Sequence, residues 1–190
     1  MRKLLSTFLK YKFVVLILVV LISAVVLART TPIEEKLTTA PQGGASYKSI
    51  VPGISSEKEV IDKLGNPLNT KTEADKKILE YQSTSPFVPH KFTLENNTVI
   101  LVKEIVTLED KISSQVLKQK YGEPPYKLFD QTSYSSTFFL FVYPEKGIAY
   151  LGHQDGTVIE VWYFQPTNLN TFMQKYAPNY SLNLPVQQGY

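Results

Sequence analysis

An internal repeat constrains the fold of this chain more than any other sequence feature. Residues 56–67 (SEKEVIDKLGNP) and 113–124 (SSQVLKQKYGEP) both start with serine, carry an apolar pair and stop at Gly-x-Pro. Strand-like residues follow each segment and end in Thr-Val-Ile-x-Val, at 98–102 and 157–161. Because self-similarity at a fixed spacing defines the folding unit, we expect one unit, a helix plus a small antiparallel sheet, to be used twice.

Helix and turn signals support this unit. Ser56 and Glu59 form an S-x-x-E capping box, and Gly65 can take the left-handed conformation that ends a helix. The pairs 96–97 (Asn-Asn) and 155–156 (Asp-Gly) stand directly before the last strand of each repeat and tolerate the positive φ of tight hairpin turns. The sequence therefore predicts an α+β fold in which helices cover one face of an antiparallel meander.

The N-terminal part reads as a membrane anchor. Residues 13–28 (FVVLILVVLISAVVLA) are apolar and uncharged, and the basic segment 1–12 precedes them. A helix of this length covers roughly 24 Å at 1.5 Å per residue, and basic flanks favour a cytoplasmic amino end. We expect a single-pass transmembrane helix with the following domain outside the cytoplasm. A cleaved signal peptide is the alternative, because Val26-Leu27-Ala28 fits a small-residue cleavage pattern.

The remaining boundaries follow from composition and periodicity. A flexible linker is indicated by the Thr, Pro and Gly residues that follow the apolar run, and a C-terminal helix by apolar residues at helical spacing after the second repeat. That helix is either an ordinary amphipathic helix or a partial third copy, and the Asn- and Gln-rich end reads as a loosely ordered tail. The expected segments are the linker 29–46, the first repeat 47–107, the second repeat 108–166, the C-terminal helix 167–178 and the tail 179–190.

Charge and cysteine content exclude several classes of function. Five of the 20 basic residues lie within the first 29 positions, so 15 basic residues remain against 17 acidic ones in residues 30–190. That part has no basic excess with which to neutralise phosphates along a nucleic acid, so nucleic-acid binding is not expected. The chain has no cysteine, which excludes disulfides, thiolate metal sites and cysteine nucleophiles.

A family resemblance rests on residues 50–55 (IVPGIS), Val60 and residues 64–67 (LGNP), with a second, eroded instance at 120–124 (KYGEP). These segments resemble the opening motif of the SmpA/OmlA (BamE-like) family of small envelope proteins. The resemblance implies helices on antiparallel sheets, and the tandem arrangement is similar to the β-lactamase-inhibitor-protein fold. Outer-membrane members carry a lipidated cysteine that this chain lacks, so the N-terminal helix indicates attachment to the cytoplasmic membrane instead.

No pattern of residues points to catalysis. The two histidines, His90 and His153, belong to no metal-ligand series, and a His-x-Asp sequence beside a hairpin turn is typical of turn stabilisation. Glu104, Glu109 and Asp110 read as a solvated connection between the repeats, and no nucleophile elbow or acylation motif occurs. We therefore expect no enzyme activity, no catalytic, cofactor-binding or metal-binding residues and no cofactor.

Aromatic residues are dense in the second repeat. Because neighbours on a strand face opposite sides of a sheet, these residues cannot all enter one core. They form either a partner-binding or glycan-binding surface, or a sheet buried on both faces by helix and tail, which is the interpretation we favour. The residues are Phe138, Phe139, Phe141, Tyr143, Tyr150, Trp162, Tyr163 and Phe164.

These observations predict a membrane-anchored, non-enzymatic envelope module that binds another protein or acts as a scaffold. One alternative is an exported inhibitor or ligand-binding module released by signal cleavage. A less favoured alternative is a hydrolase of envelope polymers, which would need carboxylates or histidines that converge in space.

Overall fold

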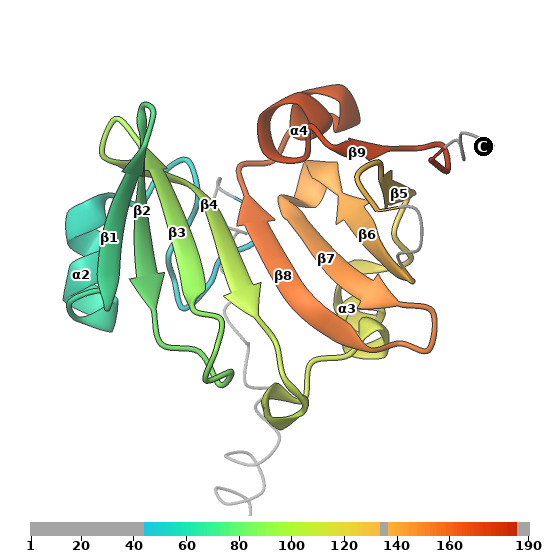
Figure 1. The fold of residues 1–190 in the computed structure, drawn as a ribbon, viewed down its shortest axis with the longest axis horizontal. Coiled ribbons are helices and arrows are strands. Elements are labelled where there is room, and N and C mark those ends of the chain that lie inside the picture. Colours follow the sequence, from blue (N-terminus) through green and yellow to red (C-terminus); the bar gives the residue numbers. More distant parts are fainter. Residues whose placement is uncertain (1–43, 134–136, 186–190) are drawn as a thin grey trace, which may run out of the picture. The chain divides into compact units, whose positions relative to one another are not determined.

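The computed structural model of the chain describes residues 44–133 and 137–185 (Figure 1). The predicted segments 1–12 and 13–28, and most of the linker 29–46, lie outside the described residues. Within the described ranges, no helix has the length and apolar character needed to cross a membrane.

The described part is an α+β fold, as predicted. Short helices alternate with runs of antiparallel strands, and two 3-10 turns, η1 (Leu108–Asp110) and η2 (Pro144–Lys146), connect them. The helices are α2 (Glu57–Leu64), α3 (Ser114–Tyr121) and α4 (Leu169–Tyr176). The strands are β1 (Asn69–Glu73), β2 (Lys76–Tyr81), β3 (His90–Glu95), β4 (Thr98–Ile105), β5 (Tyr126–Asp130), β6 (Phe138–Tyr143), β7 (Ile148–His153), β8 (Val158–Phe164) and β9 (Tyr180–Ser181).

The strands form one antiparallel sheet in the order β1-β2-β3-β4-β8-β7-β6-β5-β9 (Figure 1). Helix α2 and strands β1 to β4 make up the first half, residues 47–107, and α3 with β5 to β8 makes up the second half, residues 108–166. The last strand of each half pairs with the other, from Leu101 opposite Phe164 to Ile105 opposite Glu160. The two halves are therefore joined through equivalent strands.

The two short helices are bounded in the same way. Ser56 caps α2 by accepting the N–H of Glu59, and Ser113 caps α3 by accepting the N–H of Val116. At the other end Gly65 has φ 82° and Gly122 has φ 83°, which a residue with a Cβ rarely adopts. The capping serines and terminal glycines singled out in the sequence thus have structural roles.

A tyrosine fixes the end of each of these helices. The Tyr81 hydroxyl at the end of β2 donates to the Gly65 carbonyl oxygen at 2.9 Å. The Tyr143 hydroxyl at the end of β6 donates to the Gly122 carbonyl oxygen at 2.7 Å. Each bond satisfies a carbonyl group at a helix end, which has no partner inside the helix.

The sheet has a helix face and an α4 face. On the helix face, Val60 of α2 and Leu117 of α3 pack onto the strands of their own halves. On the α4 face, Phe172 and Tyr176 of α4 pack against strands of the second half and against Ile100 and Leu101 of β4. The second half is therefore covered on both faces, whereas on the α4 face of the first three strands the contact that a described helix makes is the ion pair of Lys175 with Glu95 at the end of β3.

Two residues of the predicted tail, 179–190, form a short strand. Strand β9 pairs with β5, with Ser181 opposite Phe129 and Tyr180 opposite Asp130. The Tyr180 ring also meets the Trp162 ring edge to face at 6.1 Å. This aromatic contact and the strand pairing hold the chain that the polar composition marked as loose. Residues 186–190 lie outside the described part.

Candidate binding sites

The structure keeps the two histidines apart. His90 lies on β3 and His153 on β7, and two strands lie between them in the sheet. His90 is buried, its Nδ1 accepts the N–H of Ile105 at 3.0 Å, and burial lowers the pKa of its imidazole. The Nδ1 of His153 accepts the N–H of Asp155 at 3.2 Å beside the last hairpin of the second half. Each histidine therefore accepts a backbone hydrogen bond and has a structural role.

The carboxylates between and within the halves do not converge either. Glu104 lies on the helix face, where burial raises its pKa and the Tyr163 hydroxyl donates to it at 2.6 Å. Glu160 lies on the opposite face, in register with Ile105. Asp110 accepts the N–H of Thr107 at 2.8 Å and so closes the η1 turn. Within residues 44–133 and 137–185, no group of three or more His, Cys, Asp or Glu side chains could hold a metal ion.

The aromatic strands of the second half belong to the core. Leu140 and Val142 of β6 are buried against the α4 face, while Tyr143 and Tyr150 are buried on the helix face. The Phe141 ring stacks on the Tyr150 ring at 4.9 Å. The structure agrees with the favoured interpretation for the five of the eight residues that are buried, namely Phe139, Tyr143, Tyr150, Trp162 and Phe164. Phe138, Phe141 and Tyr163 are half-buried.

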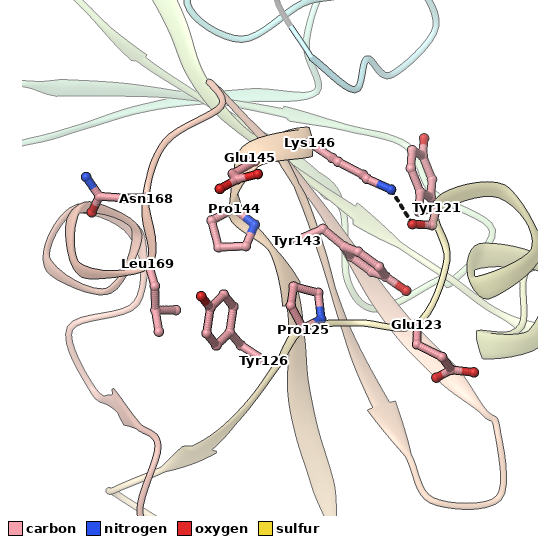
Figure 2. Close-up of a pocket in the computed structure, with 10 residues that line it drawn as sticks. All are labelled: Tyr121, Glu123, Pro125, Tyr126, Tyr143, Pro144, Glu145, Lys146, Asn168 and Leu169. Atoms are coloured by element: carbon pink, nitrogen blue, oxygen red, sulfur yellow. Dashed lines mark hydrogen bonds between the residues drawn. The ribbon is translucent and has the colours of Figure 1, made fainter.

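A pocket of about 320 Å³ opens at the end of the second half where α3 stops, η2 turns and α4 begins (Figure 2). We call it the tyrosine pocket because Tyr121, Tyr126 and Tyr143 contribute to its wall. Burial raises the pKa of Tyr143 to about 12, so its hydroxyl stays protonated and keeps its bond to the helix end. The lining residues are Tyr121, Glu123, Pro125, Tyr126, Tyr143, Pro144, Glu145, Lys146, Asn168 and Leu169.

Charged side chains stand at the edge of the tyrosine pocket. The ammonium group of Lys146 donates to the Tyr121 carbonyl oxygen, as Figure 2 shows. Glu123, which is 77% exposed, forms an ion pair with Lys118 at 2.9 Å. Sequence reasoning missed this pocket because its walls come from three separate segments, 121–126, 143–146 and 168–169, whose residues read as helix stop, turn and helix start.

An exposed apolar patch occupies the corresponding end of the first half. Phe87 is 89% exposed and Leu68 is 65% exposed, and both line a shallow hollow of about 130 Å³ together with Val88. Phe87 belongs to residues 82–89 (QSTSPFVP), which join β2 to β3 and which we call the phenylalanine loop. Large apolar side chains that are exposed side by side favour an interaction site.

The phenylalanine loop is fixed at its base. Ser83 is buried, and its Oγ lies 2.6 Å from the Val88 carbonyl oxygen and accepts the N–H of Ser85 at 3.0 Å. Thr84 donates to the Asp110 carboxylate at 2.7 Å, which ties the loop to η1. Phe87 is thus presented to solvent by a loop whose backbone is already ordered. The one sequence signal for this loop was a phenylalanine among Ser, Thr and Pro residues.

No known family model matches the chain. A stretch of 91 residues, 45% of this chain, is 32% identical to an ATP-dependent zinc metalloprotease FtsH homolog from Helicosporidium sp. subsp. Simulium jonesii. The match covers 6% of that protein, so the chain spans a small part of the length of this relative.

Two solved structures are similar to parts of the chain. A DUF4309 family protein (YjgB) from Bacillus subtilis superposes with a TM-score of 0.48 at 15% identity, over 67% of this chain and 90% of that one. A cysteine-rich secretory protein from Staphylococcus aureus gives a TM-score of 0.39 at 12% identity, over 70% of this chain and 52% of that one. Both scores are low, and neither likeness carries an argument about function.

Proposed function

We propose that the chain is a membrane-anchored, extracytoplasmic and non-enzymatic protein-binding module of the cell envelope. The observation that carries this proposal is Phe87, which is 89% exposed on a loop that is pinned by a buried serine. Exposed aromatic side chains with apolar neighbours are the usual anchors of protein interfaces. The loop is ordered before a partner arrives, which lowers the entropy lost on binding.

The composition of the phenylalanine loop indicates the chemistry of its partner. Residues 82–89 contain no charged side chain, and Phe87, Val88 and Leu68 supply its exposed apolar surface. A complementary partner would therefore offer an apolar pocket for the phenyl ring, with polar groups around it that face Glu80, Gln82 and Ser85 of the hollow. Such a pocket would desolvate the ring, which is the setting in which single interface residues contribute most to affinity.

The proposed address rests on the sequence. The apolar run 13–28 after the basic segment 1–12 supports a single-pass anchor in the cytoplasmic membrane, with the amino end in the cytoplasm. We further propose that the two halves are copies of one BamE-like unit. The shared serine caps, terminal glycines and tyrosine bonds support this duplication, as does the family resemblance of residues 50–67.

A second candidate function is an exported inhibitor or ligand-binding module released by signal cleavage, and the tyrosine pocket favours it. Its volume of about 320 Å³ and its aromatic and proline walls are typical of small-ligand sites. Cell fractionation separates the two candidates. The anchored module predicts the intact chain in the membrane fraction, whereas a released module would be recovered as a shortened chain in soluble exported material.

The hydrolase alternative has less support. It needs two carboxylates that face one substrate, whereas Glu104 and Glu160 lie on opposite faces of the sheet.

Capture of partners from solubilised membranes tests the binding proposal. The tagged full chain is compared with Phe87→Ser and with Leu184→Ser, a control that alters an exposed apolar residue (67% exposed) far along the chain. Loss of an interface anchor costs about 2 kcal/mol or more, roughly a thirtyfold loss of affinity. We expect a protein that is retained by the wild type and by Leu184→Ser and is lost with Phe87→Ser. An identical set of proteins with all three chains would contradict the proposal.

A further inference from the structure

One row of side chains crosses the whole sheet on the α4 face. In the second half and at the junction, the row is aromatic or apolar. In the first half it is polar and charged, and no described helix covers it. The row runs, strand by strand from β1, through Asn69, Glu80, Lys91, Lys103, Trp162, Ala149, Val142 and Tyr126.

Two lysines stand directly opposite each other in this row. Lys91 of β3 is in register with Lys103 of β4, so both side chains leave the sheet on the same face. Like charges in directly opposite positions of neighbouring strands are destabilising. Within the described part of the chain, neither ammonium group has a carboxylate within ion-pair distance. The sheet therefore holds two positive charges side by side, and neither is in direct ion-pair contact with a described carboxylate.

The nearest carboxylate of the row is already engaged. Glu80 accepts from the Lys71 ammonium at 2.9 Å and from the Asn69 amide at 3.0 Å. Glu160, two residues before Trp162 on β8 and diagonal to Lys103, accepts the indole N–H of Trp162 at 2.5 Å. Each of these two acids has its own hydrogen-bond donors and acts on the lysine pair only at longer range, which leaves the N–H groups of Lys91 and Lys103 for an acceptor from outside the chain.

Lys103 is also held in position. Its Nζ lies 3.7 Å from the centre of the Trp162 ring, and Trp162 is 3% exposed. Burial lowers the pKa of the Lys103 ammonium, the Glu160 carboxylate raises it, and the neighbouring Lys91 lowers it. A bound anion would offset both the burial of Lys103 and the repulsion from Lys91, because it would add negative charge beside the two ammonium groups.

We propose that Lys91 and Lys103 form a binding site for a phosphate group on the open α4 face of the first half. Two adjacent ammonium groups match a ligand that carries close to two negative charges, as a phosphate monoester does at neutral pH. A carboxylate would neutralise only one of them. Lysine binds phosphate as a point charge, and it needs none of the planar geometry that arginine requires. This site is separate from the phenylalanine loop and does not depend on it.

The single tryptophan of the chain, Trp162, reports on this site because Lys103 lies over its ring. The full chain in detergent is titrated with inorganic phosphate at constant ionic strength, with chloride as the balancing anion, while tryptophan fluorescence is recorded. We expect a saturable change with phosphate and none with chloride. The same change with acetate at equal concentration would overturn the assignment to phosphate.

Substitutions then separate binding from a structural role. Lys91→Gln is expected to weaken phosphate binding at least about tenfold and, without phosphate, to raise the melting temperature because one of two like charges is removed. Lys76→Gln, on the same face at the start of β2, is the control and should leave phosphate affinity unchanged. A Lys91→Gln chain that binds phosphate like the wild type, or that melts at a lower temperature without phosphate, would overturn the proposal.

Vesicles with and without phosphatidic acid, a lipid whose headgroup is a phosphate monoester, distinguish the source of the phosphate group. Binding that requires the anionic lipid and is weakened by Lys91→Gln assigns the site to a lipid headgroup. Saturation by inorganic phosphate alone, without vesicle binding, assigns it to a soluble phosphate-bearing ligand. Phe87→Ser should change neither result, so failure of this site and failure of the proposed protein-binding loop can be told apart.

Discussion

The two halves of the sheet share a framework and differ in what covers it. Each half has a serine-capped helix of two turns, a glycine that ends it and a tyrosine that bonds the glycine carbonyl. Helix α4 and strand β9 are added only to the second half, whose α4 face is apolar and buried. The first half leaves this face open and charged. The comparison teaches that the residues shared by the two halves stabilise the fold. Binding sites are therefore expected on the surfaces in which the two halves differ.

The loops that connect the strands also differ between the two halves. The first half joins β1 to β2 by a tight turn and β2 to β3 by the long phenylalanine loop. The second half joins the corresponding β6 and β7 by the short turn η2, beside which the tyrosine pocket opens. Equivalent ends of the two halves therefore present a projecting apolar side chain in one case and a hollow in the other.

The largest expected effect comes from loosening the cover of the second half. Phe172 of α4 is fully buried and its ring lies 4.6 Å from that of Phe164, so Phe172→Ala should lower the free energy of unfolding by about 3–5 kcal/mol. Ile78→Ala, on the uncovered face of β2, should cost much less. Urea denaturation measures both values. Equal losses would show that both halves depend on packing at this face.

A smaller and equal effect is expected at the two terminal glycines. A Cβ at Gly65 or Gly122 would meet no atom within 4 Å, so only the backbone conformation opposes Gly65→Ala and Gly122→Ala. With φ near 82° and ψ near 180°, each should cost about 1–3 kcal/mol. The same denaturation assay compares the two variants. A large cost in one half and none in the other would break the structural equivalence of the halves.

The two tyrosine bonds provide a finer comparison. Tyr81→Phe and Tyr143→Phe each remove one hydroxyl that bonds a helix-ending carbonyl group, and each should cost about 1 kcal/mol. Tyr143→Phe should also change ligand access to the tyrosine pocket, because Tyr143 contributes to its wall. Thermal melting of both variants tests the first expectation. A cost confined to one of them would mean that only one half needs its tyrosine bond.

The smallest expected effect is a pH dependence of stability that comes from His90 in the first half. Burial lowers its pKa below the usual 6.5, so the folded state resists its protonation. Above pH 6.5 the histidine is neutral in both states, and its contribution to stability is lost as the pH falls below 6.5 and through the lowered pKa. Glu104 acts in the opposite direction, because burial raises its pKa and stability therefore falls as the pH rises from about 4.5.

The His90→Gln variant isolates this effect. Its stability relative to the wild type should improve steadily as the pH is lowered from 7 to 5, because glutamine takes up no proton. Urea titrations at several pH values measure the difference. A difference between variant and wild type that is constant with pH would rule out the assigned role of His90.

Local signals explain how much of the fold could be predicted. Capping serines, helix-ending glycines and the Asn96-Asn97 turn, with φ of 48° and 64°, act within a few residues of themselves. Strand β1 was not predicted because all five of its residues are exposed and polar, so its sequence lacks the alternation of apolar and polar residues that indicates a strand. The pairing of β4 with β8 was not predicted because the paired residues lie about sixty positions apart and no local sequence signal indicates which strands pair.

The candidate sites were less predictable than the fold. The tyrosine pocket and the lysine pair are assembled from segments that only the tertiary structure brings together, such as β3 and β4 facing each other in register. Phe87 is a single aromatic residue in a polar segment, and no sequence pattern predicts that it is exposed. Its loop is held by Ser83, and the burial of Ser83 is not predictable from the sequence either. The density of aromatic residues on the strands of the second half suggested a surface, yet α4 packs on Trp162 and Phe164, while Tyr143 and Tyr150 are buried on the helix face with Leu117 of α3.

Photo-crosslinking from equivalent positions of the two halves tests the central claim most directly, namely that the phenylalanine loop is the docking element for a protein. Benzoylphenylalanine is placed at position 87 or, as the control, at position 145 in η2 of the full chain within its own membranes. The account predicts a discrete crosslinked protein from position 87 and none from position 145. Absence of an adduct at position 87, or the same adduct from both positions, would contradict it.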